Sequence, residues 1–194
     1  RRGREPERSD RPGMPDQLSF GFPATGLGFA DLVVSPVNES ALRIVQRPEN
    51  WPTPVLCLVG APKSGLTTIA HAWAQRFGGD VFEAKGFASL KARDVDARAA
   101  AFTAIDGADR VPAGDKVLSL INLISGGAGR MLLTANVPPP QWQAPSADLK
   151  SRLNSMPVTE IDPPDEAMMM GRLKAAAVRH FLKLEPDVLK YLVP

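Results

Sequence analysis

The chain has 194 residues, of which 44% are hydrophobic, and a formal net charge of +2. This length predicts one domain with at most a small appendage, and the charge is too small to indicate wholesale nucleic-acid binding. A single cysteine, Cys57, excludes a disulfide framework within the chain, and no apolar run reaches the roughly 18 residues that a membrane span needs. Because the first residues carry no signal-peptide core either, we expect a soluble protein of the cytoplasm.

The N-terminal 28 residues divide into two parts. Residues 1–13 are rich in arginine and proline, so we expect a disordered basic tail that is solvated rather than bound to nucleic acid. Residues 14–28 then bring together a glutamine and three large apolar side chains, namely Gln17, Leu18, Phe20 and Phe22. Two interpretations remain open: this segment packs on its own domain, or it docks in an extended form into a pocket of another protein.

Residues 29–47 predict the first folded elements. A short apolar run at 32–34 precedes Ser35, which suits a helix cap, and Pro36, which suits a first helical turn. The buried stripe of this helix is predicted to consist of Ala41, Leu42, Ile44 and Val45.

The most informative stretch is VLCLVGAPKSGLTT, at 55–68. Val55–Val59 is an apolar run of strand length, and the turn after it opens an amphipathic helix that extends to Phe77. A buried strand, a glycine-rich turn and a helix N-terminus together hold phosphate, because backbone N–H groups point inward and the helix dipole favours an anion. The stretch therefore predicts a phosphate loop.

The charge of this loop departs from the usual pattern, G-x-x-x-x-G-K-[ST]. Gly60, Gly65 and Thr67 are in register, but Leu66 stands where the pattern has a lysine. Lys63, inside the loop, is the only nearby ammonium group in the sequence. The loop has kept its glycines and lost its main charge, which predicts that any nucleotide binds weakly.

Further along the chain, apolar runs alternate with helical patterns. Strands are predicted at 81–84, 101–105, 131–134 and 157–161, helices at 115–125, 148–153, 165–182 and 185–192, and a short helix or loop at 85–98. Repeated strands joined by helices indicate an α/β fold whose parallel sheet is covered on both faces. The ligand site of such a sheet lies at the carboxyl ends of its strands.

Two polar residues end predicted strands at that edge. Asp106 closes the third strand, where a carboxylate can hold the Mg²⁺ of a bound nucleotide; the alternative is a turn cap. Asn136 follows the fourth strand, where it either reaches the phosphates or is a turn asparagine before a proline run. ATPases of this build place a second acid directly after the first, and here that position is Gly107.

Seven segments follow one another in a recognisable order: QLSFGF, FADLVVSPVNESAL, GAPKSGLTTIAHAWA, AIDGADRVPAGDK, LLTANVPPPQW, DLKSRL and IDPPDEAMMMGRL. Together they resemble the AAA+ domain of DnaA, the bacterial replication initiator, and more closely the short Hda/HdaA regulators of DnaA. The resemblance covers residues 17–192. It implies a P-loop AAA+ three-layer fold with a parallel five-stranded sheet and a truncated C-terminal helical lid.

The resemblance also implies a division of the chain into four parts. These are a disordered basic tail at 1–13, a clamp-binding N-terminal segment at 14–28, an AAA+ nucleotide-binding-like α/β domain at 29–162 and a partial helical lid at 163–194. In that family the protein is held on the DNA-loaded sliding clamp and presents an arginine to ATP bound by DnaA. The arginine stimulates hydrolysis, which blocks re-initiation.

Residue roles follow from the same resemblance. The clamp contacts are Gln17, Leu18, Phe20 and Phe22. Nucleotide contacts are implied at Gly60, Lys63, Ser64, Gly65, Leu66, Thr67, Thr68, Asp106 and Asn136. ADP or ATP would bind weakly, with Thr67 and Asp106 holding Mg²⁺ only when nucleotide is present. Arg152 is the implied finger acting in trans, whereas the residues alone favour an ordinary helix arginine paired with Asp148.

The expected function is thus negative regulation of replication initiation by a protein associated with the nucleoid and replisome. We expect no ATPase activity of its own, because Leu66 and Gly107 replace a lysine and an acid that hydrolysis needs. The expected partners are DnaA and the sliding clamp (beta) of DNA polymerase III, with DNA reached only through the clamp; a homodimer remains open. Two alternatives are a DnaA-like initiator paralogue that binds nucleotide and origin DNA, and a clamp-binding module whose phosphate loop has no function.

Overall fold

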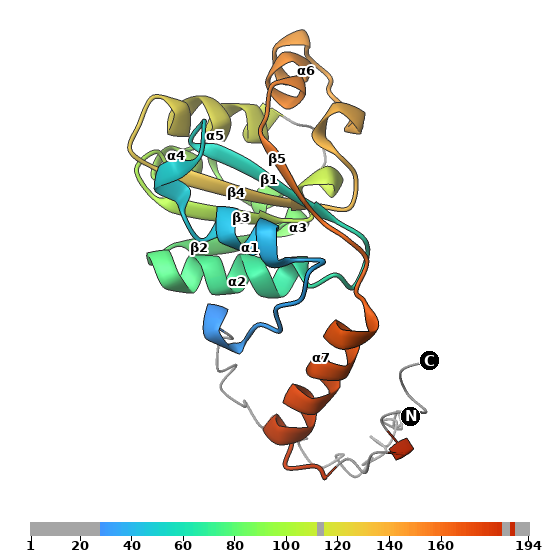
Figure 1. Cartoon of the computed structure of the whole chain (residues 1–194). Coiled ribbons are helices and arrows are strands. Elements are labelled where there is room, and N and C mark those ends of the chain that lie inside the picture. The colour runs from blue at the N-terminus through green and yellow to red at the C-terminus, as the bar shows by residue number, and fades with distance from the viewer. Residues whose placement is uncertain (1–27, 112–114, 184–186, 189–194) are drawn as a thin grey trace, which may run out of the picture.

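A computed structural model describes residues 28–111, 115–183 and 187–188. The described chain forms three layers, with helices on both faces of a central sheet (Figure 1). Both the parallel five-stranded sheet and the α/β class that the sequence predicts are confirmed. The segment with Gln17, Leu18, Phe20 and Phe22 lies outside the described residues, as does most of the predicted 185–192 helix.

The strands and helices alternate along the chain. The strands are β1 Val55–Gly60, β2 Asp80–Glu83, β3 Phe102–Asp106, β4 Arg130–Ala135 and β5 Val158–Ile161. The α-helices are α1 Glu39–Val45, α2 Leu66–Phe77, α3 Ala84–Ser89, α4 Ala92–Asp96, α5 Asp115–Ser125, α6 Ala147–Asn154 and α7 Glu166–Arg179. Single 3-10 turns are η1 Phe29–Asp31, η2 Pro48–Asn50, η3 Ala108–Arg110 and η4 Pro139–Gln141. Every strand that the sequence predicts is present.

The sheet has the strand order β2-β3-β4-β1-β5, and all neighbours are parallel. The central strand is therefore β4, between β3 and β1, and β1 lies between β4 and the edge strand β5. Because the strands are parallel, β1, β3 and β4 end at the same edge. The phosphate loop, Asp106 and Asn136 follow these three strands, so the fold gathers them at one edge.

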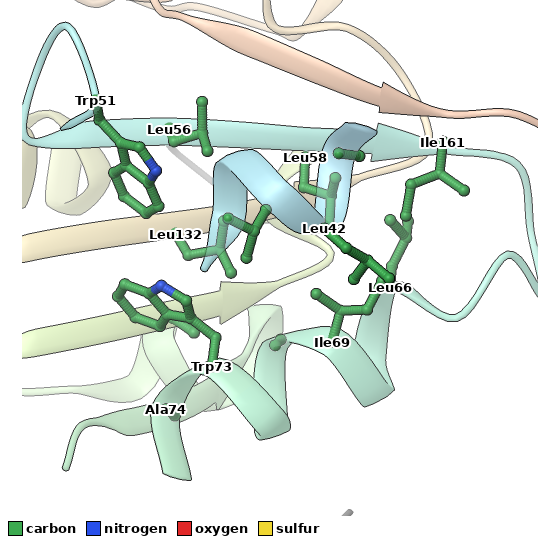
Figure 2. Close-up of a cluster of buried hydrophobic side chains, with 14 residues drawn as sticks. Leu42, Trp51, Leu56, Leu58, Leu66, Ile69, Trp73, Ala74, Leu132 and Ile161 are labelled. Atoms are coloured by element: carbon green, nitrogen blue, oxygen red, sulfur yellow. The ribbon is translucent and has the colours of Figure 1, made fainter. Parts of the chain in front are cut away.

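Alternate residues along the strands point to opposite faces of the sheet and pack in two separate hydrophobic cores, as expected when both faces are covered. On the face under α1 and α2, Leu56 and Leu58 of β1 pack with Leu132 of β4, as Figure 2 shows. Trp73 of α2 is fully buried there and stacks on Trp51, with ring centroids 5.8 Å apart. This contact fixes α2, the helix that follows the phosphate loop, against the sheet.

The opposite face carries α3, α4 and α5. Cys57 of β1 belongs to this second core, where it is fully buried beside α5 residues such as Leu120 and Ile124. Burial, with a smaller contribution from the charge of Asp109, raises the pKa of the Cys57 thiol. The prediction that Cys57 is a packed, unpaired thiol is confirmed.

Two details of the predicted elements are wrong. The first α-helix begins at Glu39 rather than beside Pro36, because Asn38 Oδ1 accepts a hydrogen bond from Ser35 N–H at 2.9 Å and closes a turn before the helix. Ile44, predicted as part of the buried stripe, is 44% exposed, since only the face with Ala41, Leu42 and Val45 meets the core.

The last described helix, α7, extends away from the sheet beyond the carboxyl edge of the strands (Figure 1). Asp165 caps it, since its Oδ1 accepts a hydrogen bond from Met168 N–H at 2.7 Å. Met168 is fully buried, whereas Val178 near the end of the helix is exposed. Among the residues that the structure describes, no helix is long and apolar enough to cross a bilayer.

Candidate functional site

The phosphate loop connects β1 to α2 through two left-handed residues. Gly65 has φ 102 and Lys63 has φ 68, a conformation that glycine adopts freely and lysine does not. Ile69 N–H donates to Gly65 O at 3.0 Å, so the hydrogen-bond ladder of α2 begins there. The amides of Thr67 and Thr68 precede the ladder and face the loop, which gives the helix start its affinity for an anion.

A cavity of about 580 Å³ opens at this edge of the sheet. Seven of the nine residues that the sequence predicts as nucleotide contacts line it, namely Lys63, Gly65, Leu66, Thr67, Thr68, Asp106 and Asn136. Gly60 and Ser64 do not line it. Ser64 is 1% exposed, and within the described chain its Oγ has no hydrogen-bond partner. The N–H of Ser64 donates to Ala61 O at 3.1 Å, so neither its side chain nor its backbone amide faces the cavity as a free phosphate donor.

Asp106 is the centre of a hydrogen-bonded chain on one wall of the cavity. Thr67 Oγ1 donates to its Oδ2 at 2.7 Å, and Thr134 Oγ1 donates to its Oδ1 at 2.5 Å. Gly107 N–H donates in turn to Thr134 Oγ1 at 3.1 Å. Both carboxylate oxygens are thus satisfied, and the carboxylate is joined directly to the hydroxyl of the phosphate loop.

The pair of Thr67 and Asp106 suits Mg²⁺ in its donor chemistry. A hydroxyl and a carboxylate are hard oxygen donors, and Mg²⁺ in nucleotide sites takes one or two such ligands while phosphates and water supply the rest. The described residues contain no group of three or more acidic, histidine or cysteine side chains that could hold a metal alone. These residues therefore fit a magnesium ion that arrives with a nucleotide.

Asn136 bridges two strand ends. Its Nδ2 donates to Gly60 O at 2.8 Å, and its N–H donates to Asp109 Oδ2 at 3.3 Å. Asn136 thereby fixes the end of β1, directly before the phosphate loop, to the ends of β3 and β4. Asn136 lines the cavity as well, at the carboxyl edge of the sheet.

The cavity has no cation at the position of Leu66. This side chain is only 9% exposed and packs in the first core with Ile69 and Ile161 (Figure 2). Other positive charges line the cavity instead: two acidic residues, Asp31 and Asp106, face four basic ones. The four are Lys63, Arg110, Arg172 and Arg179. The cavity therefore remains net positive, which favours an anionic ligand.

Arg172 of α7 is the residue that the sequence gave no reason to select. Its Nη1 donates to Lys63 O at 2.7 Å and its Nη2 donates to Ser64 O at 2.6 Å. Burial lowers the pKa of this guanidinium, which nevertheless remains charged at neutral pH. More than a hundred residues separate Arg172 from the loop, so no local pattern could have linked them.

Position 107, where ATPases of this build have a second acid, does not accommodate an acidic side chain. Gly107 is buried and has φ 72, and a Cβ built on it would lie against the guanidinium of Arg110. An aspartate there would need both a left-handed backbone and a displaced Arg110. The nearby Asp109 does not line the cavity, and its Oδ1 is buried without a hydrogen-bond partner in the described chain.

Arg152 occupies a different part of the molecule. It lies on α6, at the far end of the molecule from α7 in Figure 1, and does not line the cavity. Its side chain is 48% exposed, and its Nε is 3.9 Å from Asp148 Oδ1. The pairing with Asp148 that the residues favoured is present, but it is long and exposed to solvent.

Comparisons with known proteins place this fold. No protein-family model and no curated protein matches the chain. Solved structures do match: DnaA bound to AMPPCP and single-stranded DNA (TM-score 0.69), and AMPPCP-bound DnaA from Aquifex aeolicus (TM-score 0.68), each 18% identical. Domain III of DnaA from Thermotoga maritima matches at 17% identity with a TM-score of 0.69.

The matches cover 86% of this chain in each case. They cover 59% of the two AMPPCP-bound DnaA chains and 79% of the isolated domain III, so the chain spans about three fifths of those longer DnaA structures. The fold is thus that of an α/β domain with a strand–loop–helix turn at the carboxyl edge of its parallel sheet. More particularly, the chain has the AAA+ fold of DnaA domain III.

Proposed function

We propose that the chain is a DnaA-related regulator of chromosomal replication initiation, which stimulates hydrolysis of DnaA-bound ATP through Arg152. The observation that carries this proposal is the position of Arg152. Its side chain is half exposed and lies outside the chain's own cavity, and among the described residues its one ion pair is the 3.9 Å contact with Asp148. An exposed ion pair of this kind contributes at most about 1 kcal/mol, so Arg152 can leave Asp148 for a better acceptor at little cost.

The chemistry of such an arginine is well defined. A guanidinium that reaches the γ-phosphate stabilises the charge of the transition state and accelerates hydrolysis by about 10³- to 10⁵-fold in characterised NTPases. Because the nucleotide belongs to the partner, the donor protein needs no hydrolytic machinery of its own. The absence of a lysine at Leu66 and of an acid at Gly107 agrees with this division of labour.

The chain's own cavity has a different role in this proposal. The amides at the start of α2, the basic side chains and the Thr67–Asp106 pair suit ADP, or ATP with Mg²⁺, bound weakly. Two of the similar DnaA structures hold AMPPCP, which supports nucleotide binding by this fold. Without a lysine at position 66, the loop is expected to retain nucleotide without hydrolysing it.

Residues 14–28 supply the tether. Gln17, Leu18, Phe20 and Phe22 would bind the sliding clamp of DNA polymerase III, which holds the regulator on DNA where DnaA acts. Linking two binding events in this way raises the effective concentration of the second site to the millimolar range for a short linker. The clamp would therefore increase stimulation without taking part in the chemistry.

The experiment is single-turnover hydrolysis of ATP bound to DnaA, with DNA-loaded clamp, in the presence of this protein or its variants. The protein is expected to accelerate turnover. Arg152→Ala is expected to reduce that acceleration by a factor of at least about 10³. Arg93→Ala is the matched control, because Arg93 is another exposed helix arginine beside an aspartate. Undiminished acceleration by Arg152→Ala would overturn the proposal.

The same assay separates the alternatives. ATP turnover by the isolated protein, or tight specific binding of origin duplex, would identify an initiator paralogue. Clamp binding without any effect on DnaA would identify an interaction module. The tether is tested by Phe20→Ala with Phe22→Ala, which is expected to lower stimulation only when loaded clamp is present.

A further inference from the structure

A single side chain joins α7 to the phosphate loop through two backbone acceptors. Arg172 donates to Lys63 O at 2.7 Å and to Ser64 O at 2.6 Å. The guanidinium lies so close to the loop that a Cβ on Gly65 would be 2.8 Å from its Nη2. Position 65 must therefore be glycine for two reasons, its left-handed φ of 102 and the contact with Arg172.

The two acceptors are the carbonyls one helical turn before Thr67 and Thr68. In a longer helix Lys63 O and Ser64 O would accept hydrogen bonds from these two amides, because each N–H bonds the carbonyl four residues earlier. Arg172 satisfies the carbonyls from outside the helix instead, and the ladder starts only at Ile69. The left-handed Lys63 and Gly65 end the helical path before this turn, so the first-turn amides of Thr67 and Thr68 have no carbonyl partner within the helix and stay available to an anion in the cavity.

The contact also supports a strained residue. Lys63 is left-handed with φ 68, a conformation that is strained for a residue with a Cβ. Its carbonyl is one of the two that Arg172 binds, and charge-assisted hydrogen bonds are about twice as strong as neutral ones. Leu66 packs in the core and carries no charge, so the charged hydrogen bonds to these two loop carbonyls come from α7.

We propose that Arg172 is a positioning residue, which holds the phosphate loop in its anion-binding shape and couples an occupied loop to the position of α7. This inference rests on the weak nucleotide binding proposed above, and it adds a residue and a consequence to that site. The phosphate binds the amide side of the loop while Arg172 binds its carbonyl side, so the two contacts do not compete. By linkage, ligand binding then strengthens docking of α7 to the same degree as docking strengthens ligand binding.

The test is calorimetric titration of the full chain with ADP and, separately, with pyrophosphate, which reports on the phosphate loop alone. Arg172→Ala is expected to weaken both ligands about tenfold, within the usual range of coupling between sites. Arg172→Lys keeps the charge and one carbonyl contact, and it is expected to recover part of the loss. Lys174→Ala removes one positive charge from an exposed position of the same helix outside the cavity, and is expected to change affinity about threefold or less.

A second readout separates positioning from simple destabilisation. Hydrogen exchange is measured with and without ADP, after thermal unfolding has shown that each variant is folded. In the unaltered chain ADP is expected to slow exchange both in the loop and in α7; in Arg172→Ala the slowing should be confined to the loop. Ligand-dependent protection of α7 that survives Arg172→Ala would overturn the coupling.

The possible failures are distinguishable. Equal ADP affinity of Arg172→Ala and the unaltered chain would overturn the inference while leaving stimulation of DnaA through Arg152 intact. An unaltered chain that binds neither ADP nor pyrophosphate would overturn the inference too, together with the nucleotide part of the proposed function. Loss of DnaA stimulation alone, with the tenfold effect of Arg172→Ala retained, would overturn the proposed function and leave this site standing.

Discussion

The cavity edge and the α6 surface each present an arginine, and the two arginines differ in the contacts that their guanidinium groups make within the chain. Arg172 makes two hydrogen bonds to the phosphate loop, at 2.7 and 2.6 Å, and is partly buried. Arg152 has one 3.9 Å contact and a side chain that is 48% exposed. The first arginine acts within this chain, whereas the second is available to another molecule.

The same contrast extends to the neighbouring groups. Around the cavity both oxygens of Asp106 accept hydrogen bonds, and Asn136 ties β1 to the neighbouring strand ends. On α6 only the inward residues Leu149 and Leu153 are buried. A rigid, internally bonded cavity and an exposed cation suit a protein that retains a ligand with one region and acts on a partner with the other.

The largest expected effect concerns the anchor of the cavity region. Trp73→Ala removes a fully buried ring that stacks on Trp51 and touches Phe77 and Phe102. Loss of a buried tryptophan is expected to lower the free energy of unfolding by about 3–5 kcal/mol. Denaturant unfolding measures it, with the 96% exposed Phe181→Ala as a control expected to stay within about 0.5 kcal/mol. A Trp73→Ala loss below about 1 kcal/mol would show that α2 is not anchored there.

Asp106→Asn is expected to be the next largest change. An asparagine presents one acceptor oxygen to two hydroxyl donors, Thr67 and Thr134, so one of them loses its partner. Thr134 is buried whereas Thr67 is exposed and can turn its hydroxyl to water, so the cost of about 1–3 kcal/mol of unfolding free energy arises when the buried Thr134 loses its acceptor. The same variant is expected to lose any dependence of ADP binding on Mg²⁺. A Mg²⁺ effect that persists in Asp106→Asn would place the ion elsewhere.

Leu66→Lys adds a positive charge to the cavity at the position where the usual phosphate-loop pattern has a lysine. Leu66 lines the cavity from the edge of the core, so a longer lysine can extend its ammonium group toward a bound phosphate. We expect ADP affinity to increase about tenfold, or about 1.4 kcal/mol. Calorimetric titration against the unaltered chain measures the change. Unchanged or weaker affinity would mean that the loop does not contact phosphate at this position.

Cys57 tests whether the core beside the sheet excludes solvent between the two regions. Burial raises the pKa of this thiol in the folded chain, so the folded chain keeps it neutral. The contribution of the thiol to the free energy of unfolding is therefore complete below the unfolded pKa of about 8.5 and decreases as the pH rises above it. Between pH 7.5 and 9.5 the loss from this group is expected to be about 1.4 kcal/mol. Cys57→Ala should remove that part of the pH dependence. Equal pH profiles for the two proteins would mean that the thiol is not excluded from solvent.

The smallest expected effect belongs to the α6 surface. Asp148→Ala breaks the long pair with Arg152 and is expected to change the free energy of unfolding by less than about 0.5 kcal/mol. Stimulation of DnaA should be retained, because Asp148 is not the acceptor that matters in the complex. A loss of stimulation in Asp148→Ala with an intact fold would instead show that the pair orients Arg152.

Much of the fold could be predicted because local patterns decide it. The buried run that became β1 and the periodic stripe of α5 were predicted almost to the residue. Strand ends of a parallel sheet share one edge, which is why Thr67 and Asp106 could be expected near each other. Ile44 was misjudged because an apolar residue at the border of a helix stripe shows its exposure only once the neighbouring elements are in place.

The site could be predicted only in part. The loop, Asp106 and Asn136 carry local signals, but Arg172 has none, since an arginine among the apolar residues of α7 indicates only a helix surface. Its role depends on how α7 returns to the loop, a contact over 108 residues of sequence. The Arg152 and Gln17–Phe22 assignments remain predictions that rest on the resemblance.

The most direct measurement is the distance between Arg152 and the partner's nucleotide in a structure of this protein bound to DnaA and AMPPCP. A guanidinium nitrogen of Arg152 is expected within about 3 Å of a γ-phosphate oxygen, with the contact to Asp148 released. A complex in which Arg152 stays beside Asp148 while another surface of the chain faces the nucleotide would contradict the proposed function.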